Sequence, residues 1–438
     1  MNLVPLAIQF QKVLSGDSPV MYVRAEPENI DFTAGGTGKL LVVSSVGEIT
    51  IPLSSQNLTT ILGFLSSTVF SDEMTVIGWG IKSLFSFLKY HLQSPYVTAC
   101  NILDLKVLES LCDRREDAPV DFWAAMTRLQ AVVKDEAWPK LKMLYKHVYQ
   151  PLMTKVMPAL ETQGMLDQKN RVTLYSSYEV DSGKNGRLKC SQAFKSCFNP
   201  HSITPEDKVR FRPRLLNDQF LLFDFRHMEV SVLQWLTGDE HLGEILSLEH
   251  DPYKVIFKLI SHTDCDNDNK RDACKSFFLP VVYGMGATTL AKELSLSQGT
   301  AETIIKRIYS LFPKALAWVQ ERQKEAQTDN VCYDVLGRRR YFNDRHYRAR
   351  DFVVQSPASA VCLEKLVLLH DAIGGYASLA AHIHDGYLIT VSKAATRAVA
   401  DIGTEVLQGD SLLCPGLKLK VTCKLGRSLD ALESYEKA

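Results

Sequence analysis

The sequence lacks an excess of charge of either sign. Lys and Arg together number 50, as do Asp and Glu, so the formal net charge is zero. A neutral chain excludes proteins that bind nucleic acid through overall charge alone, so an anionic partner has to be met by a local basic patch. Apolar residues make up 46% of the 438 residues, which is enough for a sizeable core and excludes a mainly disordered protein.

The sequence also lacks the marks of membrane or secreted proteins. No apolar run approaches the length of a membrane-spanning helix, and the N-terminus has no early positive segment or small-residue cleavage site. The ten cysteines include no Cys-x-x-Cys pair. We therefore expect no membrane partner, free thiols in a reducing compartment and no zinc site.

Three parts follow one another along the chain. Residues 1–118 alternate apolar strands with helices, which predicts a small α/β domain that ends at a charged, proline-containing break. Residues 119–200 are helical and then polar and rich in turns. Residues 201–438 combine a long helical stretch with short apolar strands, among them 221–225 and 380–391.

Two aspartates end or join apolar strands. Asp224 follows the run Phe220–Phe223, and Asp385 lies in a tight turn between two strands. Taken singly, Asp224 is explained as a helix N-cap and His-Asp-Gly as a hairpin turn. Two rigid carboxylates on neighbouring strands, however, suit a pair of hard divalent cations, which prefer carboxylates together with water and phosphates. Such a pair activates an attacking oxygen and stabilises a leaving one.

A helix between the two aspartates carries four residues spaced by four: Arg271, Lys275, Leu279 and Tyr283. On a helix this spacing forms one slowly winding stripe. Its two cations suit phosphates, and its apolar and aromatic members suit a sugar and a base. The stripe therefore predicts a nucleoside triphosphate site, and the alternative is a solvated amphipathic helix.

The order of these blocks resembles the polymerase core of family A DNA polymerases over about residues 150–425. The first family motif, DYSQIELR followed by GD, is matched by Asp224–Val230 with Gly238-Asp239. The second, R-x3-K-x3-F-x3-YG, is matched by the stripe and Gly284, and the third, HDE, by His384-Asp385-Gly386. Two further blocks match: Asn185–Leu188 for the family's TGRLSS and Phe352–Ala360 for its FPIQGTAAD.

The resemblance implies an α+β fold, with a right-hand polymerase palm and fingers built of an antiparallel sheet plus helices. Residues 1–118 would be a degenerate exonuclease-like domain, because its metal-binding acids are mostly absent and Asp104 is at most a relic. The alternative for these residues is an unrelated α/β domain. Residues 119–200 would form a helical region and a reduced thumb. Residues 201–438 would form the palm and fingers, with the fingers at about 240–325.

The resemblance also implies roles for single residues. Asp224 and Asp385 would bind two Mg²⁺ ions, for which Mn²⁺ could substitute. Glu229 would exclude a ribose 2′-hydroxyl, and Lys275 would protonate the pyrophosphate leaving group. The remaining implied contacts are Arg271, Lys275, Leu279 and Tyr283 with the nucleotide, Arg187 and Gln355 with the primer–template minor groove, and His384 with the primer terminus.

The sequence departs from the family at two notable positions. Leu279 replaces the usual aromatic ring, and Gly386 replaces the acidic third residue of the last motif.

Six arginines fall within thirteen residues, which predicts a phosphate-contact surface. They are Arg338, Arg339, Arg340, Arg345, Arg348 and Arg350.

The function expected from the resemblance is a template-directed DNA polymerase that adds deoxynucleoside triphosphates to a primer 3′ end without proofreading. Its partners would be primer–template DNA and dNTP, and a processivity factor or replisome partner stays open. The alternative is a catalytically weak, polymerase-like DNA-binding subunit of a replication complex. A single-subunit RNA polymerase is disfavoured by Glu229. The expected location is the cytoplasm of a bacterial or phage-infected cell, with an organelle left open.

Overall fold

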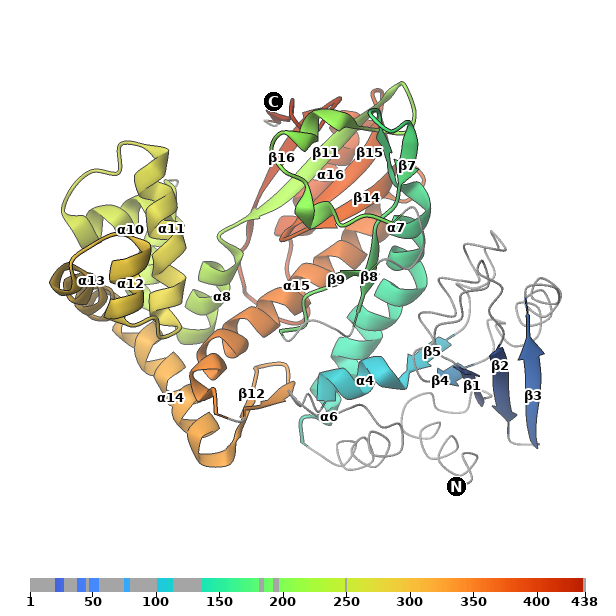
Figure 1. Cartoon of the computed structure of the whole chain (residues 1–438), viewed down its shortest axis with the longest axis horizontal. Coiled ribbons are helices and arrows are strands. Elements are labelled where there is room, and N and C mark those ends of the chain that lie inside the picture. The colour runs from blue at the N-terminus through green and yellow to red at the C-terminus, as the bar shows by residue number, and fades with distance from the viewer. Residues whose placement is uncertain are drawn as a thin grey trace.

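The computed structural model describes residues 20–26, 38–44, 47–54, 75–78, 101–112, 136–180, 185–191, 197–248, 250–342 and 344–435. Residues 81–92 and 121–135, where the sequence pattern is helical, lie outside the described residues. Figure 1 shows a strand-rich N-terminal part, a central sheet with long helices, and a lobe made only of helices. The predicted α+β class is confirmed.

The N-terminal strands form one mixed sheet in the order β3-β2-β1-β4-β5. The β1–β2 and β2–β3 pairs are antiparallel, whereas β1–β4 and β4–β5 are parallel. Parallel neighbours need a crossover connection, which agrees with the α/β pattern predicted for this part. The elements are β1 (Val20–Glu26), β2 (Gly38–Ser44), β3 (Gly47–Leu53), β4 (Thr75–Gly78), β5 (Asn101–Asp104) and α4 (Leu105–Cys112).

A long helical run follows, and it ends at Gly164. The run carries two widened π-type segments, and its apolar face is fully buried in the core. Gly164 has φ +60°, and a Cβ there would lie 2.4 Å from the carbonyl oxygen of Leu174, so only glycine fits. The run comprises α6 (Trp138–Leu144), η4 (Tyr145–Tyr149), η5 (Leu152–Val156) and α7 (Met157–Gln163).

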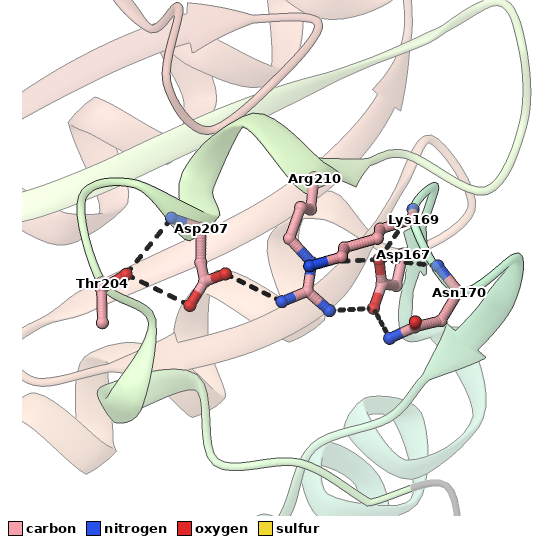
Figure 2. A network of polar contacts seen from close by, with 6 residues as sticks. All are labelled: Asp167, Lys169, Asn170, Thr204, Asp207 and Arg210. Carbon is pink, nitrogen blue, oxygen red and sulfur yellow. Dashed lines mark hydrogen bonds and ion pairs between the residues drawn. The ribbon is translucent and has the colours of Figure 1, made fainter.

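Short strands and turns connect this helical run to the central sheet. They are β6 (Met165–Asp167), β7 (Val172–Leu174), β8 (Ser177–Glu179), β9 (Lys189–Ser191), η6 (Pro200–Ser202), η7 (Asp207–Arg210) and β10 (Phe211–Arg212). Figure 2 shows how Arg210 joins them: Nη2 donates to Asp167 Oδ2 (2.5 Å) and Nη1 donates to Asp207 Oδ1 (2.8 Å). Asp207 is held in turn by Thr204, whose hydroxyl donates to it at 3.1 Å.

The central sheet is fully antiparallel, in the order β14-β15-β11-β16-β17. Because side chains alternate along a strand, Phe223 and Asp224 of β11 face opposite sides. The ring of Phe223 packs against Gly403 of the covering helix α16, so Asp224 faces away from that helix. The elements are β11 (Asp218–Arg226), β14 (Ala377–Ile383), β15 (Gly386–Ser392), β16 (Lys420–Gly426), β17 (Glu433–Ser434) and α16 (Thr396–Gln408).

The all-helical lobe inserts after β11. Four of its helices begin at side-chain caps of the expected types, with Asp239, Asp251, Asn267 and Ser297 each accepting a backbone N–H bond. The helices are α8 (Met228–Thr237), α9 (Glu240–Ser247), α10 (Pro252–Ser261), α11 (Asp268–Val282), α12 (Ala287–Glu293), α13 (Gln298–Leu311) and α14 (Pro313–Asp329).

A hairpin forms between β12 (Val331–Tyr333) and β13 (Arg339–Tyr341), and η8 (His346–Arg348) leads into α15 (Ala349–Ile373). The segment His346–Ile373 is long and apolar enough to cross a membrane, contrary to the expectation that no apolar run approaches that length. Because 89% of its most apolar window is buried by protein, it fits the core helix of a folded domain. Eight cysteines of the described part are free thiols, as expected.

Candidate active site

Strand register brings the two predicted aspartates together. Asp224 of β11 pairs with Gly386 of β15, and the preceding residue, Asp385, lies in the two-residue turn that joins β14 to β15. The backbone N–H of Phe225 donates to the Asp385 carbonyl oxygen (3.4 Å). The hairpin thus holds one carboxylate at its tip beside the other on the neighbouring strand.

The two carboxylates influence each other. Burial, and then the nearby Asp385 charge, raise the pKa of Asp224 above its usual value, while Lys275 and Lys424 act in the opposite direction. Two hard oxygen donors under mutual repulsion fit a divalent cation, which would relieve that repulsion. Within the described ranges no group of three or more His, Cys, Asp or Glu side chains could hold a metal ion. The remaining ligands would therefore be water or substrate phosphate oxygens.

Gly386, the departure from the HDE motif, lies at a close approach of two strands. A Cβ at this position would lie 2.8 Å from the Phe223 carbonyl oxygen and 3.2 Å from Asp224 Oδ1. A larger residue would have to push β15 away from β11. The glycine therefore keeps the turn of Asp385 close to Asp224.

Glu229 is the meeting point of four segments. It lies in the first turn of α8 with 15% of its side chain exposed, and its carboxylate accepts a hydrogen bond from the Arg187 guanidinium. The hydroxyl of Tyr283 donates to it at 3.0 Å, and the amide of Gln355 at 3.4 Å. Burial and the Glu229 charge hold the pKa of Tyr283 well above its ordinary value, so this hydroxyl stays protonated and donates.

Gln355 is itself held in place. Its Oε1 accepts from Asn185 Nδ2 (2.6 Å), and Asn185 Oδ1 accepts from Arg340 Nη1 (2.8 Å). Arg340 also stacks over the rings of Phe342 and Phe352. The sequence pointed to Asn185 only as part of a motif, because a single asparagine before a glycine signals no more than a turn.

The expectation of one exposed arginine surface is wrong for Arg338 and Arg340, which are 4% and 2% exposed. Arg338 Nε donates to Asp334 Oδ2 (2.9 Å), and its other nitrogens donate to the Ser356 carbonyl and to Tyr149 Oη. These two guanidinium groups are satisfied inside the protein and are not free for phosphates. The patch interpretation failed because charge density in a sequence does not reveal buried carboxylate partners.

The predicted nucleotide-binding residues of α11 differ in their exposure and in their partners. Lys275 is exposed, and its charge acts to lower the pKa of Asp224, so the ammonium group lies within electrostatic reach of that carboxylate. Arg271 is bound by Asp251 at 2.9 Å and by Asp272 at 2.8 Å. Leu279 is half-buried against the core. Asp251 was missed because its Asp-Pro sequence signals a helix cap, which it also is.

A cavity of about 370 Å³ lies next to Asp385 and is lined by Arg187, Glu229 and three histidines. His384 was predicted, whereas His201 and His382 were missed, because no spacing pattern links residues from separate turns. Burial, followed by the neighbouring His201 ring, lowers the pKa of His382 to about 3, so this ring is neutral. Burial, His384 and Arg187 likewise lower the pKa of His201.

Comparison with known protein families shows to which class of protein the chain belongs. The family model for DNA polymerase family A matches residues 123–431, which is well over half of the chain. The chain therefore belongs to DNA polymerase family A.

Individual relatives are distant. The chain is 26% identical over 266 residues to thermostable DNA polymerase I of Thermus aquaticus, which covers 57% of this chain and 32% of the relative. It is 23% identical over 226 residues to DNA polymerase theta of Caenorhabditis elegans, covering 49% and 14%. The chain thus spans less than a third of the length of these relatives.

The fold has a counterpart among solved structures. The POL domain of Pol1 from M. smegmatis, solved in complex with a DNA primer-template and dNTP, matches with a TM-score of 0.74 at 14% identity. The match covers 98% of this chain and 99% of that chain. At this identity the match establishes the fold alone.

Proposed function

We propose that this chain is a template-directed DNA polymerase, which joins deoxynucleotides to the 3′ end of a primer. The observation that carries the proposal is the convergence of residues from distant motifs on one site. Asp224 and Asp385 adjoin through strand register, and Glu229 links Arg187, Gln355 and Tyr283. A purely structural protein has no need for two adjoining carboxylates, one of them within electrostatic reach of an exposed lysine.

The proposed reaction is nucleotidyl transfer. The primer 3′-oxygen attacks the α-phosphorus of the dNTP and loses its proton, the bond from that phosphorus to the β-phosphate bridging oxygen breaks, and pyrophosphate leaves. Asp224 and Asp385 would hold two Mg²⁺ ions, which supply charge stabilisation for the attacking and leaving oxygens. Lys275 makes no ion pair within the described residues, so it is free to donate a proton to the departing pyrophosphate.

The remaining site residues would position the substrates. Glu229 closes the space beside a bound nucleotide sugar, which would disfavour a ribose 2′-hydroxyl. Arg271 would steady the triphosphate after exchanging a carboxylate partner, because Asp251 and Asp272 occupy it here. Leu279 and Tyr283 would contact the sugar and base, and Arg187, Gln355 and His384 the primer–template.

We also infer that the N-terminal region does not proofread. Asp104, the proposed relic, is 1% exposed, and its carboxylate accepts the Lys106 N–H (3.0 Å) at the start of α4. Its backbone N–H donates to the Tyr145 hydroxyl. Both contacts give Asp104 a structural role where the sheet meets the long helical run.

Single-nucleotide incorporation tests the proposal. The chain is incubated with Mg²⁺ and four primer–templates that differ only in the templating base, and each dNTP and rNTP is offered alone. We expect one added nucleotide, only for the complementary dNTP. Binding of the duplex without any incorporation would favour the alternative, a DNA-binding subunit. Equal use of dNTP and rNTP would remove Glu229 from its proposed role.

A further inference from the structure

His201 is held in a defined orientation by its own turn. It lies in η6, where Asn199 Oδ1 accepts the backbone N–H of His201 (3.0 Å). The Ser202 hydroxyl donates to the Asn199 carbonyl at 2.7 Å, and Pro200 restricts the backbone between them. This short turn therefore fixes the backbone from which the imidazole projects.

The ring of His201 meets His384 directly. The two Nδ1 atoms lie 3.2 Å apart, and the rings are nearly perpendicular, with centroids 4.6 Å apart. One Nδ1 must donate and the other accept, so the hydrogen bond ties the orientation of each ring to that of the other. His201 Nε2 is buried and has no partner among the described residues, which leaves His384 as the hydrogen-bond partner of this ring.

His384 needs such support because its backbone is strained. Its φ is +54°, in the left-handed region that favours glycine, and the next residue is Asp385. The strand before it is braced by Tyr178 of β8, whose ring also meets the His201 ring edge-on. Tyr178, fully buried, donates to the His382 carbonyl (2.6 Å) and accepts the His382 N–H (2.9 Å).

We propose that His201 is a positioning residue, which holds the His384 ring where the 3′-terminal nucleotide of a primer binds. The proposal rests on the proposed function, because it specifies how the primer site of that polymerase is built. Both rings line the cavity of about 370 Å³ that also contains Asp385 and Arg187. A ring that turned freely there would place the primer end less reproducibly, and misplacement of about 1 Å costs roughly 100-fold in rate.

The test compares four variants of the histidine pair with one control. His201→Leu removes the hydrogen bond at similar bulk, whereas His201→Asn keeps a polar atom near the position of Nδ1. His384→Leu and the double variant complete a mutant cycle, and His147→Ala, at an exposed histidine, is the matched control. Two readouts are used: the single-turnover extension rate in Mg²⁺, and the fluorescence of 2-aminopurine at the primer 3′ end in a complex without metal.

We expect His201→Leu to slow extension by about tenfold with little change in the half-saturating dNTP concentration, and His201→Asn to recover most of the rate. The aminopurine signal should shift alike in both leucine variants, and the double variant should be no worse than His384→Leu. Additive effects, or an unshifted signal in His201→Leu, would overturn the proposal. The fluorescence needs no catalysis, so this result stands even if the wild-type chain extends no primer.

Discussion

At the residue scale, Gly186 leaves no room for a side chain beside the candidate active site. Its φ is +75°, and a Cβ there would lie 2.3 Å from Nη1 of the buried Arg338. The next residue is Arg187, which contacts Glu229. The loop at Gly186 therefore packs directly on the Arg338 guanidinium. This packing accounts for the burial of Arg338, whereas a phosphate contact would require an exposed guanidinium.

We predict that Gly186→Ala lowers the extension rate by about tenfold, because the loop must move and carry Arg187 with it. Gly238→Ala is the matched control, since Gly238 also has positive φ (+59°) but a Cβ added there would meet no atom within 4 Å. Both variants should lose about 1 kcal/mol of stability from backbone strain. Equal extension rates for the two would show that the contact with Arg338 does not matter.

At the scale of secondary-structure elements, the Arg210 network joins β6 to the turn before the central sheet (Figure 2). Burial alone would raise the pKa of Asp167, but hydrogen bonds from Arg210 and Asn170 hold it below its usual value. A depressed pKa stabilises the folded state at any pH above the unfolded value of about 3.9. That contribution is lost as the pH falls through the lower, folded value.

We predict that Arg210→Gln lowers the unfolding temperature by several degrees at pH 7 and by less at pH 3, because below about 3.9 the unfolded chain carries a proton that folding of the wild type must remove from Asp167. Lys208→Gln, at an exposed neighbouring cation, should change neither value. Thermal unfolding across a pH series is the measurement. A constant difference between Arg210→Gln and the wild type at all pH values would contradict the assigned role of this ion pair.

These elements also show what could be predicted from the sequence. The apolar runs at 221–225 and 380–391 predicted β11, β14 and β15, and the motif order predicted which side chains meet near Asp224. Contacts set by tertiary packing could not be predicted, namely the burial of Arg338, the Arg271–Asp251 pair and the His201–His384 pair. Neither the Arg271–Asp251 pair nor the His201–His384 pair joins residues whose separation in sequence follows a helical or strand period. Arg338 lies four residues after its partner Asp334, but its contact with Tyr149 comes from a distant segment.

At the scale of the whole molecule, the burial of two arginines bears on the proposed binding of DNA. Arg345 is exposed, whereas Arg338 and Arg340 are not. The extent of the thumb and the boundary at residue 118 stay predictions. Phosphate contacts must then come from fewer cations of this segment than the sequence indicated, so we expect extension in short bursts that shorten as salt rises.

We predict that Arg345→Ala lowers the slope of log affinity against log salt by about 0.9, equally for unrelated DNA sequences. Arg338→Ala should instead cost about 3 kcal/mol of folding stability, because it leaves the Asp334 carboxylate buried without its cation. Duplex binding across a salt series, with unfolding measured in parallel, separates the two effects. A lowered slope for a fully stable Arg338→Ala protein would restore the patch interpretation.

The central claim is that Asp224 and Asp385 carry the chemistry of a DNA polymerase. The most direct measurement is single-turnover primer extension in Mg²⁺ by Asp224→Asn and Asp385→Asn, with Asp218→Asn on the same strand as control, alongside duplex affinity. We predict that both site variants lose at least about 1,000-fold in rate with duplex affinity within about twofold, and that the control matches the wild type. Near-normal extension by either site variant would contradict this claim.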